Sequence, residues 1–287
     1  MSQTSNMNNT KLVLGTAQLA QAYGITRPLL QDEGRGSKLL AAAARLGIMT
    51  LDTAPTYGDA EATIGVDGWL GEVHTKLSRD LDPAASLEAS LAALRRPQVE
   101  VLYLHAPEEL LDPQSSVIRS AGDLVGRGAT ALGASVYSVR EFEAALGHPS
   151  VSVIQVPLNV LDQRFANNPL RQAADVGVTI YARSAFLQGI LLAHVTALPV
   201  EVARLGPLVR QFQQIAEAHG LTPAALALAW VRAQPNLAGV IVGAQNDSEL
   251  AEIVTAWRAI VPHNALAALE DLAPAPPMLV DPRRWTT

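Results

Sequence analysis

The sequence contains no cysteine among its 287 residues. This absence excludes disulfide bonds and thiolate metal sites, and it removes any sign of a small disulfide-stabilised secreted scaffold. No apolar run approaches the about 18 residues that a membrane-spanning helix needs. Residues 1–10 are polar and lack the apolar stretch of a signal peptide. We therefore expect a cytoplasmic protein with no membrane partner.

Positive charge is also scarce, because 21 Lys and Arg stand against 27 Asp and Glu, for a formal net charge of −6. No basic stripe is present, so nucleic acid is not an expected partner. The sequence has no G-x-G-x-x-G fingerprint, no Walker A motif and no H-E-x-x-H. The six histidines lack ligand spacing, so no metal site is expected. The sequence specifies no oligomeric state.

What the chain does contain is a series of short apolar segments that alternate with helix-like patterns. Such segments are typical of strands buried on both faces of a parallel sheet. Helices are predicted between them, for example over 114–125, 223–233 and 248–257, with Thr222 and Asp59 as helix N-caps. The eight predicted strands cover residues 12–15, 48–54, 73–77, 99–105, 131–135, 151–157, 178–183 and 239–243.

Alternation of this kind predicts a parallel sheet. Eight units favour closure into a single-domain (β/α)8 TIM barrel over residues 11–272, with an open, doubly wound sheet as the alternative. Residues 1–10 are expected to form a disordered tail. Residues 273–287 are rich in proline and are expected to form a tail that packs on or near the barrel. Phe165 and Trp285 fall in a predicted loop and in this tail, where we expect them to be exposed.

Three polar residues stand at the C-terminal ends of consecutive predicted strands, namely Asp52, Lys76 and His105, and Tyr57 follows Asp52 on a loop. In a barrel these four side chains converge at one mouth, where active sites form. Taken singly, each residue is most simply structural, and it is their coincidence that indicates function. An ammonium group lowers the pKa of a neighbouring phenol, which is ordinarily near 10. Such a site suits the protonation of an alkoxide as it forms, which carbonyl reduction by hydride requires.

The same residues carry a resemblance to the aldo-keto reductases, which spans residues 11–257. The matching motifs are Gly15-Thr16, Asp52-Thr53-Ala54 through Tyr57-Gly58 with Glu61, Thr75-Lys76, Tyr103-Leu104-His105, Gly133-Ala134-Ser135, residues 155–159, Thr222-Pro223 and Gly243. The resemblance implies a barrel that uses a nicotinamide cofactor without a Rossmann fingerprint, which agrees with the absence of that motif. It also implies that Asp52, Tyr57, Lys76 and His105 form a catalytic tetrad, with Tyr57 as the acid/base.

By the same resemblance, Ser135 and Gln155 would hold the carboxamide of the cofactor, and Gly15, Thr16, Ser184, Phe186, Gly189, Gly243 and Gln245 would lie along it. Arg183 and Glu249 are also expected to contact the cofactor. Val136 and Arg183 depart from the family pattern, since many members have an Asn and an aromatic that stacks on the nicotinamide there. Glu249 stands where members that prefer the phosphorylated cofactor present a basic residue. We therefore take NADP as the family expectation and NAD as the alternative, with weak discrimination between the two.

The run from Arg183 to Gly189 resembles a subgroup found with bacterial sugar metabolism, which implies a sugar-like or hydroxylated carbonyl substrate. The leading hypothesis is NAD(P)H-dependent reduction of an aldehyde or ketone to an alcohol. One alternative is a dehydratase or epimerase that uses its nicotinamide transiently, which Arg183 keeps open. The other is a non-catalytic regulatory barrel, against which the intact tetrad argues. We expect the loops over residues 18–30, 106–113 and 186–207 to form the walls of the pocket.

Overall fold

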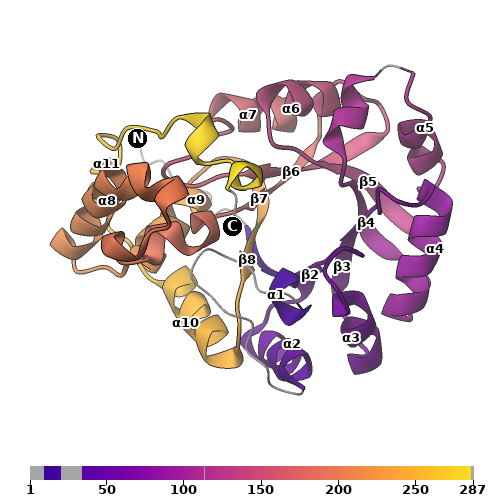
Figure 1. Ribbon diagram of the computed structural model, residues 1–287, viewed down its shortest axis with the longest axis horizontal. Coiled ribbons are helices and arrows are strands. Elements are labelled where there is room, and N and C mark those ends of the chain that lie inside the picture. Colours follow the sequence, from indigo (N-terminus) through magenta and orange to yellow (C-terminus); the bar gives the residue numbers. More distant parts are fainter. Residues whose placement is uncertain (1–9, 21–33, 113, 286–287) are drawn as a thin grey trace, which may run out of the picture.

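A computed structural model describes residues 10–20, 34–112 and 114–285. Its centre is a closed ring of eight parallel strands in chain order (Figure 1). The ring closes where β1 pairs with β8, in register from Lys11 opposite Gly239 to Gly15 opposite Gly243. The predicted barrel is thus confirmed, and the open sheet was wrong. The strands are β1 (Lys11–Gly15), β2 (Thr50–Asp52), β3 (Glu72–Lys76), β4 (Val99–Leu104), β5 (Ala129–Ser135), β6 (Val151–Pro157), β7 (Thr179–Arg183) and β8 (Leu237–Gly243).

Helices surround this ring on its outer side (Figure 1). Within the described ranges, none of them is both long and apolar enough to cross a bilayer. The α-helices are α1 (Ala17–Ala20), α2 (Arg35–Leu46), α3 (Ala60–Asp67), α4 (Pro83–Leu94), α5 (Ser116–Gly122), α6 (Val139–Leu146), α7 (Asn168–Asp175), α8 (Gly206–Ala218), α9 (Pro223–Arg232), α10 (Asp247–Arg258) and α11 (His263–Ala267). Short 3₁₀ segments include η1 (Pro107–Leu111), η2 (Leu187–Leu192), η3 (Val195–Ala197), η4 (Val200–Leu205), η5 (Pro277–Leu279) and η6 (Pro282–Arg284).

Local chemistry explains where several of these helices begin and end. The hydroxyl of Thr222 accepts a hydrogen bond from the N–H of Ala225, and Pro223 occupies the first helical position, so α9 starts as predicted. Gly47 closes α2 in a left-handed conformation, with φ of 85°. Asp59 does stand at the N-cap of α3, but its side chain makes no capping hydrogen bond.

Two predicted elements are shorter than expected. The second strand stops at Asp52 because the chain turns immediately afterwards, where the N–H of Tyr57 donates to the carbonyl of Ala54 at 3.0 Å. The helix predicted over 114–125 covers only α5. Before it, the N–H of Ser115 bonds to the carbonyl of Asp112, so a turn occupies the first predicted residues. After it, the N–H of Val125 bonds to the carbonyl of Gly122, a tight turn that ends the helix.

An apolar layer fills the inside of the barrel and fixes which residues reach its mouth. The side chains of Val13, Val101, Tyr103, Val153, Tyr181 and Ile241 pack together there. Glycine makes room for the tyrosines, since a Cβ on Gly133 would lie 2.5 Å from the Tyr103 ring. A larger core lies between strands and helices. It includes Phe165, which is fully buried against Phe142, so the expectation of an exposed Phe165 was wrong.

The segment from residue 273 to 285, here called the C-terminal segment, packs along the outside of the barrel. The N–H of Ala275 donates to the carbonyl of Leu161 at 2.9 Å, and Val280 is buried. The indole of Trp285 is partly buried and donates to the carbonyl of Leu279. Figure 1 shows this segment in yellow, beside β7. Its Arg283 side chain thereby reaches Tyr137, on the loop that follows β5.

Candidate active site

The rim at the C-terminal ends of the strands collects the residues that the sequence singled out. Side chains alternate along a strand, so the residue two positions beyond an inner-layer residue also faces inward. On β1, β6, β7 and β8 these positions are Gly15, Gln155, Arg183 and Gly243, and the corresponding residue directly after β4 is His105. The rings of His74 and Tyr103 meet inside the barrel, and Lys76 follows His74 at the same spacing. Asp52 and Ser135 end their own strands.

A buried ion pair joins two of these rim residues. The Lys76 ammonium donates to a carboxylate oxygen of Asp52 at 2.8 Å and to the carbonyl of Thr53 at 2.8 Å. Only 2% of the Lys76 residue is exposed, and Asp52 is buried as well. Burial alone lowers the pKa of Lys76, but the negative charge of Asp52, with a contribution from the neighbouring Tyr57 phenol, outweighs it and raises the pKa. Lys76 is therefore held as a fixed positive charge.

Tyr57 places its ring over this charge. The Lys76 ammonium lies 4.9 Å from the centre of the Tyr57 ring. Burial raises the pKa of the Tyr57 phenol above its usual value of 10.0, while the charge of Lys76 pulls the pKa down and that of Asp52 pushes it up. The phenol is thus protonated at neutral pH, next to a cation that stabilises the phenolate it would become on giving up its proton.

His105 directly follows β4 and is neutral at pH 7. Burial, followed by the positive charges of Lys76 and Arg79, lowers the pKa of His105 to about 4. Its ring Nδ1 is buried and has no hydrogen-bond partner among the described residues. A neutral imidazole carries one N–H donor and one acceptor nitrogen. His105 can therefore donate a hydrogen bond to an uncharged oxygen and remain neutral itself.

Ser135 and Gln155 stand opposite the ion pair and are bonded to each other. The Ser135 hydroxyl donates to the side-chain oxygen of Gln155 at 3.2 Å. The amide nitrogen of Gln155 crosses the barrel and donates to the second carboxylate oxygen of Asp52 at 2.8 Å. Asp52 therefore has hydrogen bonds on both of its oxygens, which fixes its orientation toward Lys76.

A cavity of about 120 Å³ opens above this rim. Asp52 and Tyr57 line it, whereas Lys76 and His105 do not. The predicted cofactor residues that line it are Gly15, Gln155, Arg183, Ser184, Phe186, Gly189, Gly243 and Glu249. Thr16, Ser135 and Gln245 do not. Thr16 lies behind the cavity, where its hydroxyl donates to the carbonyl of Asp52.

The expected pocket walls are only partly correct. The loop after β7 contributes several lining residues, but the described residues of the loop after β4 contribute none. For the loop after β1, Gln18 lines the cavity, and residues 21–30 lie outside the described residues, as does Pro113 of the loop after β4. The sequence placed Gln18 at the start of an expected pocket wall, because it follows β1 by one short turn, but did not single it out as a binding residue.

The end of the cavity between β1 and β8 offers an unpaired acceptor to a polar ligand group. The side-chain oxygen of Gln18 is buried and has no hydrogen-bond partner among the described residues. A Cβ on Gly243 would lie 2.1 Å from that oxygen, so the Gln18 side chain packs directly against the backbone at Gly243. On the facing loop, Ser184, Leu187 and Gln188 have positive φ of 49–63°. Left-handed backbone at non-glycine residues clusters at ligand sites, so these residues suit a nicotinamide cofactor.

Glu249 lines the same end of the cavity and is held by the backbone. Its carboxylate accepts a hydrogen bond from the N–H of Gln245 at 2.8 Å. Its own N–H donates to the side chain of Asn246, the N-cap of α10, at 2.9 Å. An acidic group is thus fixed at the N-terminus of α10, where a helix ordinarily attracts anions.

The sequence of this chain is similar to those of a known family and of several known proteins. The profile of the aldo/keto reductase family matches residues 11–273. The chain is 28% identical over 277 residues to the 6-dehydroglucose reductase of Novosphingobium aromaticivorans, covering 83% of this chain and 86% of that protein. It is 30% identical over 264 residues to a putative voltage-gated potassium channel subunit beta of Schizosaccharomyces pombe, covering 74% and 75%.

The barrel also has close structural counterparts. The holo form of an aldo-keto reductase from Bacillus halodurans superposes with a TM-score of 0.76 at 19% identity, covering 93% of each chain. Members of the matching family are NAD(P)H-dependent carbonyl reductases. The chain therefore belongs to the aldo/keto reductase family and is an NAD(P)-dependent oxidoreductase.

Proposed function

We propose that this protein reduces a hydroxylated, sugar-like aldehyde or ketone to an alcohol, with Asp52, Tyr57, Lys76 and His105 as its catalytic residues. The observation that supports this best is the buried Lys76 ammonium between the Asp52 carboxylate and the Tyr57 ring. A buried ion pair is costly to desolvate and is a poor source of stability. Beside the Tyr57 phenol at the cavity wall, this ion pair can instead support the transfer of a proton from the phenol.

The nicotinamide cofactor supplies the hydride when it is bound. The residues of the chain handle the oxygen and its proton. Tyr57, protonated at neutral pH, donates its proton to the substrate oxygen as negative charge develops there. Lys76 stabilises the phenolate that remains, and Asp52 keeps Lys76 charged and in place. The neutral His105 ring donates a hydrogen bond that orients the oxygen.

The cofactor is proposed to lie along the cavity end formed by Gly15, Gln18, Gly243 and the loop after β7. The family habit favours NADP, but Glu249 favours NAD. A 2′-phosphate carries nearly two negative charges and is bound best by Arg or Lys. A carboxylate fixed at that end of the cavity repels the phosphate and can accept hydrogen bonds from an unphosphorylated ribose.

Replacement of Tyr57 by Phe tests the role of the phenol. Oxidation of NADH or NADPH, followed at 340 nm with a panel of carbonyl compounds, should be about 10²- to 10⁴-fold slower in Tyr57→Phe. Cofactor binding should stay within about threefold of wild type. Near-wild-type turnover in Tyr57→Phe, with cofactor still bound, would remove Tyr57 from the mechanism.

The same assay separates net reduction from the dehydratase or epimerase alternative. Net reduction consumes one reduced cofactor for each alcohol formed, so the two amounts must match. A transient redox cycle forms product without net loss of cofactor absorbance. Product without cofactor consumption would therefore replace the proposed reaction by the alternative.

The proposed substrate class rests on the polar lining of the cavity, with Arg183, Gln155 and Gln188 among its residues. The name of the Novosphingobium relative, 6-dehydroglucose reductase, points the same way. Sugars and hydroxy-carbonyl compounds should have higher kcat/KM values than simple alkyl aldehydes of equal length. If alkyl aldehydes react much more efficiently, this substrate class is wrong.

A further inference from the structure

Glu61 carries a buried carboxyl group that the proposed mechanism does not use. It lies in the first turn of α3, and only 6% of the residue is exposed. Burial raises the pKa of Glu61 above its usual 4.5, while the hydroxyls of Thr75 and Ser90 and the charge of Lys76 lower it only in part. Burying such a group is costly, so its use must lie in the groups that it contacts.

The main contact of Glu61 is a short hydrogen bond to the strand that carries Lys76. The Thr75 hydroxyl donates to Oε1 of Glu61 at 2.5 Å, and the Thr75 residue is fully buried. Side chains alternate along a strand, so Thr75 faces the outer helices while the adjacent Lys76 faces the mouth of the barrel. The hydrogen bond therefore fixes β3 one residue away from the Lys76 ammonium.

The other end of this hydrogen bond is joined to Tyr57 by a tight turn. The N–H of Ala60 donates to the carbonyl of Tyr57 at 3.2 Å. Ala60 is also the first residue of α3, and Glu61 is the second. The bond to Thr75 thus connects the segment that carries the Tyr57 phenol to the strand that carries the ammonium.

Close packing against α4 limits the movement of α3. Gly65 is four residues after Glu61, so it lies on the same side of the helix. A Cβ on Gly65 would lie 2.1 Å from the carbonyl oxygen of Ala93, in α4. Because the two backbones are this close, α3 has little room to follow a shorter side chain at position 61. The length of the Glu61 side chain therefore decides whether the bond to Thr75 forms.

We propose that Glu61 is a positioning residue for carbonyl reduction, which through its hydrogen bond to Thr75 sets the distance between the Tyr57 phenol and the Lys76 ammonium. This assignment rests on the proposed function, because it concerns the residues that are proposed to move the proton. The property that matters is the reach of the Glu61 side chain and its acceptor oxygen, and not its charge.

Two variants of Glu61 separate reach from charge. Glu61→Asp keeps the charge and shortens the side chain, whereas Glu61→Gln keeps the length and an acceptor oxygen and removes the charge. A single turnover is followed by the absorbance of the reduced cofactor, with the protein saturated with that cofactor and with a carbonyl compound. Glu61→Asp should be about 10- to 100-fold slower than wild type, since small misplacements of reacting groups are this costly. Glu61→Gln should remain within about threefold of wild type.

The same hydrogen bond can be removed at its other end. Thr75→Val has nearly the shape of threonine and lacks the donor, whereas Thr75→Ser keeps it. Thr75→Val should slow the turnover about 10- to 100-fold, and Thr75→Ser should stay close to wild type. The double variant Glu61→Asp, Thr75→Val should be no slower than the slower single variant, because both changes remove one interaction.

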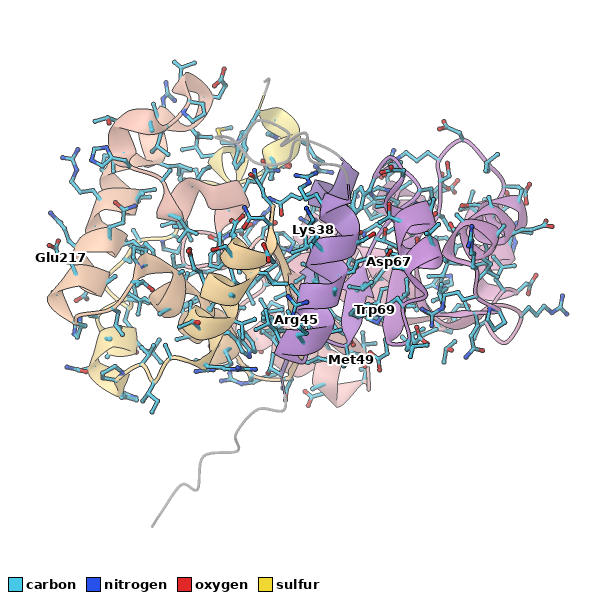
Figure 2. All side chains as sticks on the ribbon, turned by 90° about the horizontal axis from the view of Figure 1, so that it is seen from below. Lys38, Arg45, Met49, Asp67, Trp69 and Glu217 are labelled. Atoms are coloured by element: carbon cyan, nitrogen blue, oxygen red, sulfur yellow. The ribbon has the colours of Figure 1, made fainter. Side chains whose placement is uncertain are left out.

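Thr50→Val is the matched control, because it removes an equivalent bond at the base of the barrel, the end opposite the mouth. The Thr50 hydroxyl donates to Oε2 of Glu72 at 2.9 Å, and Thr50 is buried. Figure 2 shows Met49, which directly precedes Thr50, beyond the Arg45 end of α2. Thr50→Val should lower the midpoint of unfolding in denaturant, as Thr75→Val does, and leave the turnover rate unchanged. Equal slowing in Thr50→Val and Thr75→Val would reduce the effect to general destabilisation and overturn the proposal.

The remaining outcomes separate this inference from the proposed function. KM and the affinity for reduced cofactor should change less than about threefold in the folded variants, because the bond acts on the proton donor and not on binding. A Glu61→Gln variant slower than Glu61→Asp would assign the role to charge and overturn the proposal. Wild-type rates in Glu61→Asp would overturn it too and leave the proposed function standing, even if Thr75→Val does not fold. If the wild-type protein reduces no carbonyl compound, the proposed function fails and this inference fails with it.

Discussion

The Lys76 ammonium lies 2.8 Å from the carboxylate of Asp52, at the junction of two neighbouring strands, and both residues are buried. Each oxygen of that carboxylate has a partner, because Gln155 binds the other one. The pair therefore has two separable effects. It sets the charge beside Tyr57, and it satisfies two groups that would be very costly to bury alone.

Variants of this pair should separate stability from chemistry. Lys76→Met leaves the Asp52 carboxylate buried without its counter-ion, and unfolding in denaturant should show a loss of about 3–5 kcal/mol. The double variant Asp52→Asn, Lys76→Met removes both charges and should recover most of this stability. It should not recover carbonyl reduction. Recovery of turnover in the double variant would show that the ion pair is structural only.

The second prediction concerns stability at low pH and rests on His74. This residue is buried in the barrel, with its ring 4.9 Å from that of Tyr181. Burial lowers the pKa of His74 to about 4 from its ordinary 6.5. Between these pH values the unfolded chain binds a proton on His74 and the folded protein does not. Stability should therefore fall as the pH drops from 6.5 to 4, by about 1.4 kcal/mol per pH unit for this one group.

The variant His74→Phe keeps a ring in place and removes the titration. Free energies of unfolding, measured by denaturant titration at several pH values, should depend less on pH in His74→Phe than in wild type over that window. Above pH 7 the difference between the two proteins should be constant. His105 titrates in the same sense, because its pKa is also lowered to about 4, so part of the slope should persist. Identical slopes in the two proteins would contradict a neutral buried His74.

The third prediction concerns Tyr137, whose ring lies between the guanidinium groups of Arg183 and Arg283, at 4.1 and 3.8 Å from its centre. Tyr137→Phe keeps the ring and should unfold in denaturant as wild type does. Tyr137→Leu removes both cation–π contacts, each worth about 0.5–2 kcal/mol, so its free energy of unfolding should fall measurably below that of Tyr137→Phe. Equal free energies of unfolding for the Phe and Leu variants would show that the ring contributes only general packing.

The sequence predicted the barrel and its rim for a physical reason. Each strand is a short apolar run, so the polar residue at its C-terminal end can be identified where the run stops. Asp52, Lys76 and His105 were found in this way, whereas Arg183 was found through the family resemblance. Contacts that depend on packing between distant segments could not be found. The stack of Arg183, Tyr137 and Arg283 brings together three segments that no local pattern connects.

The same dependence on packing between distant segments explains why the sequence misplaced Phe165 and did not single out Gln18. Phe165 lies in a segment that reads as a loop, yet this loop folds inward and its ring packs on Phe142 of α6. Gln18 follows β1 without any motif, and only the closure of β8 against β1 brings it to Gly243. In both cases the position depends on tertiary structure rather than on local propensity.

The last prediction concerns cofactor choice and rests on Glu249. A carboxylate at the cavity end, fixed by the N–H of Gln245, opposes a 2′-phosphate, while the N-terminus of α10 offsets part of that repulsion. We expect kcat/KM for NADH to equal or exceed that for NADPH. Glu249→Arg should shift the ratio toward NADPH by about 10- to 100-fold, because the change replaces repulsion by a charge-assisted contact.

Two further variants separate the effect of the Glu249 charge on cofactor choice from its role in capping α10. Glu249→Gln keeps an acceptor for the Gln245 N–H without the negative charge, so it should shift the ratio in the same direction by a smaller factor. Glu252→Arg makes the same charge change at an exposed position of α10 that does not line the cavity, and the ratio should barely move. A wild-type preference for NADPH above about a hundredfold, or about 2.7 kcal/mol, would show that another residue binds the phosphate. In that case Glu249 would serve only to cap α10, and Glu249→Gln would leave the ratio unchanged.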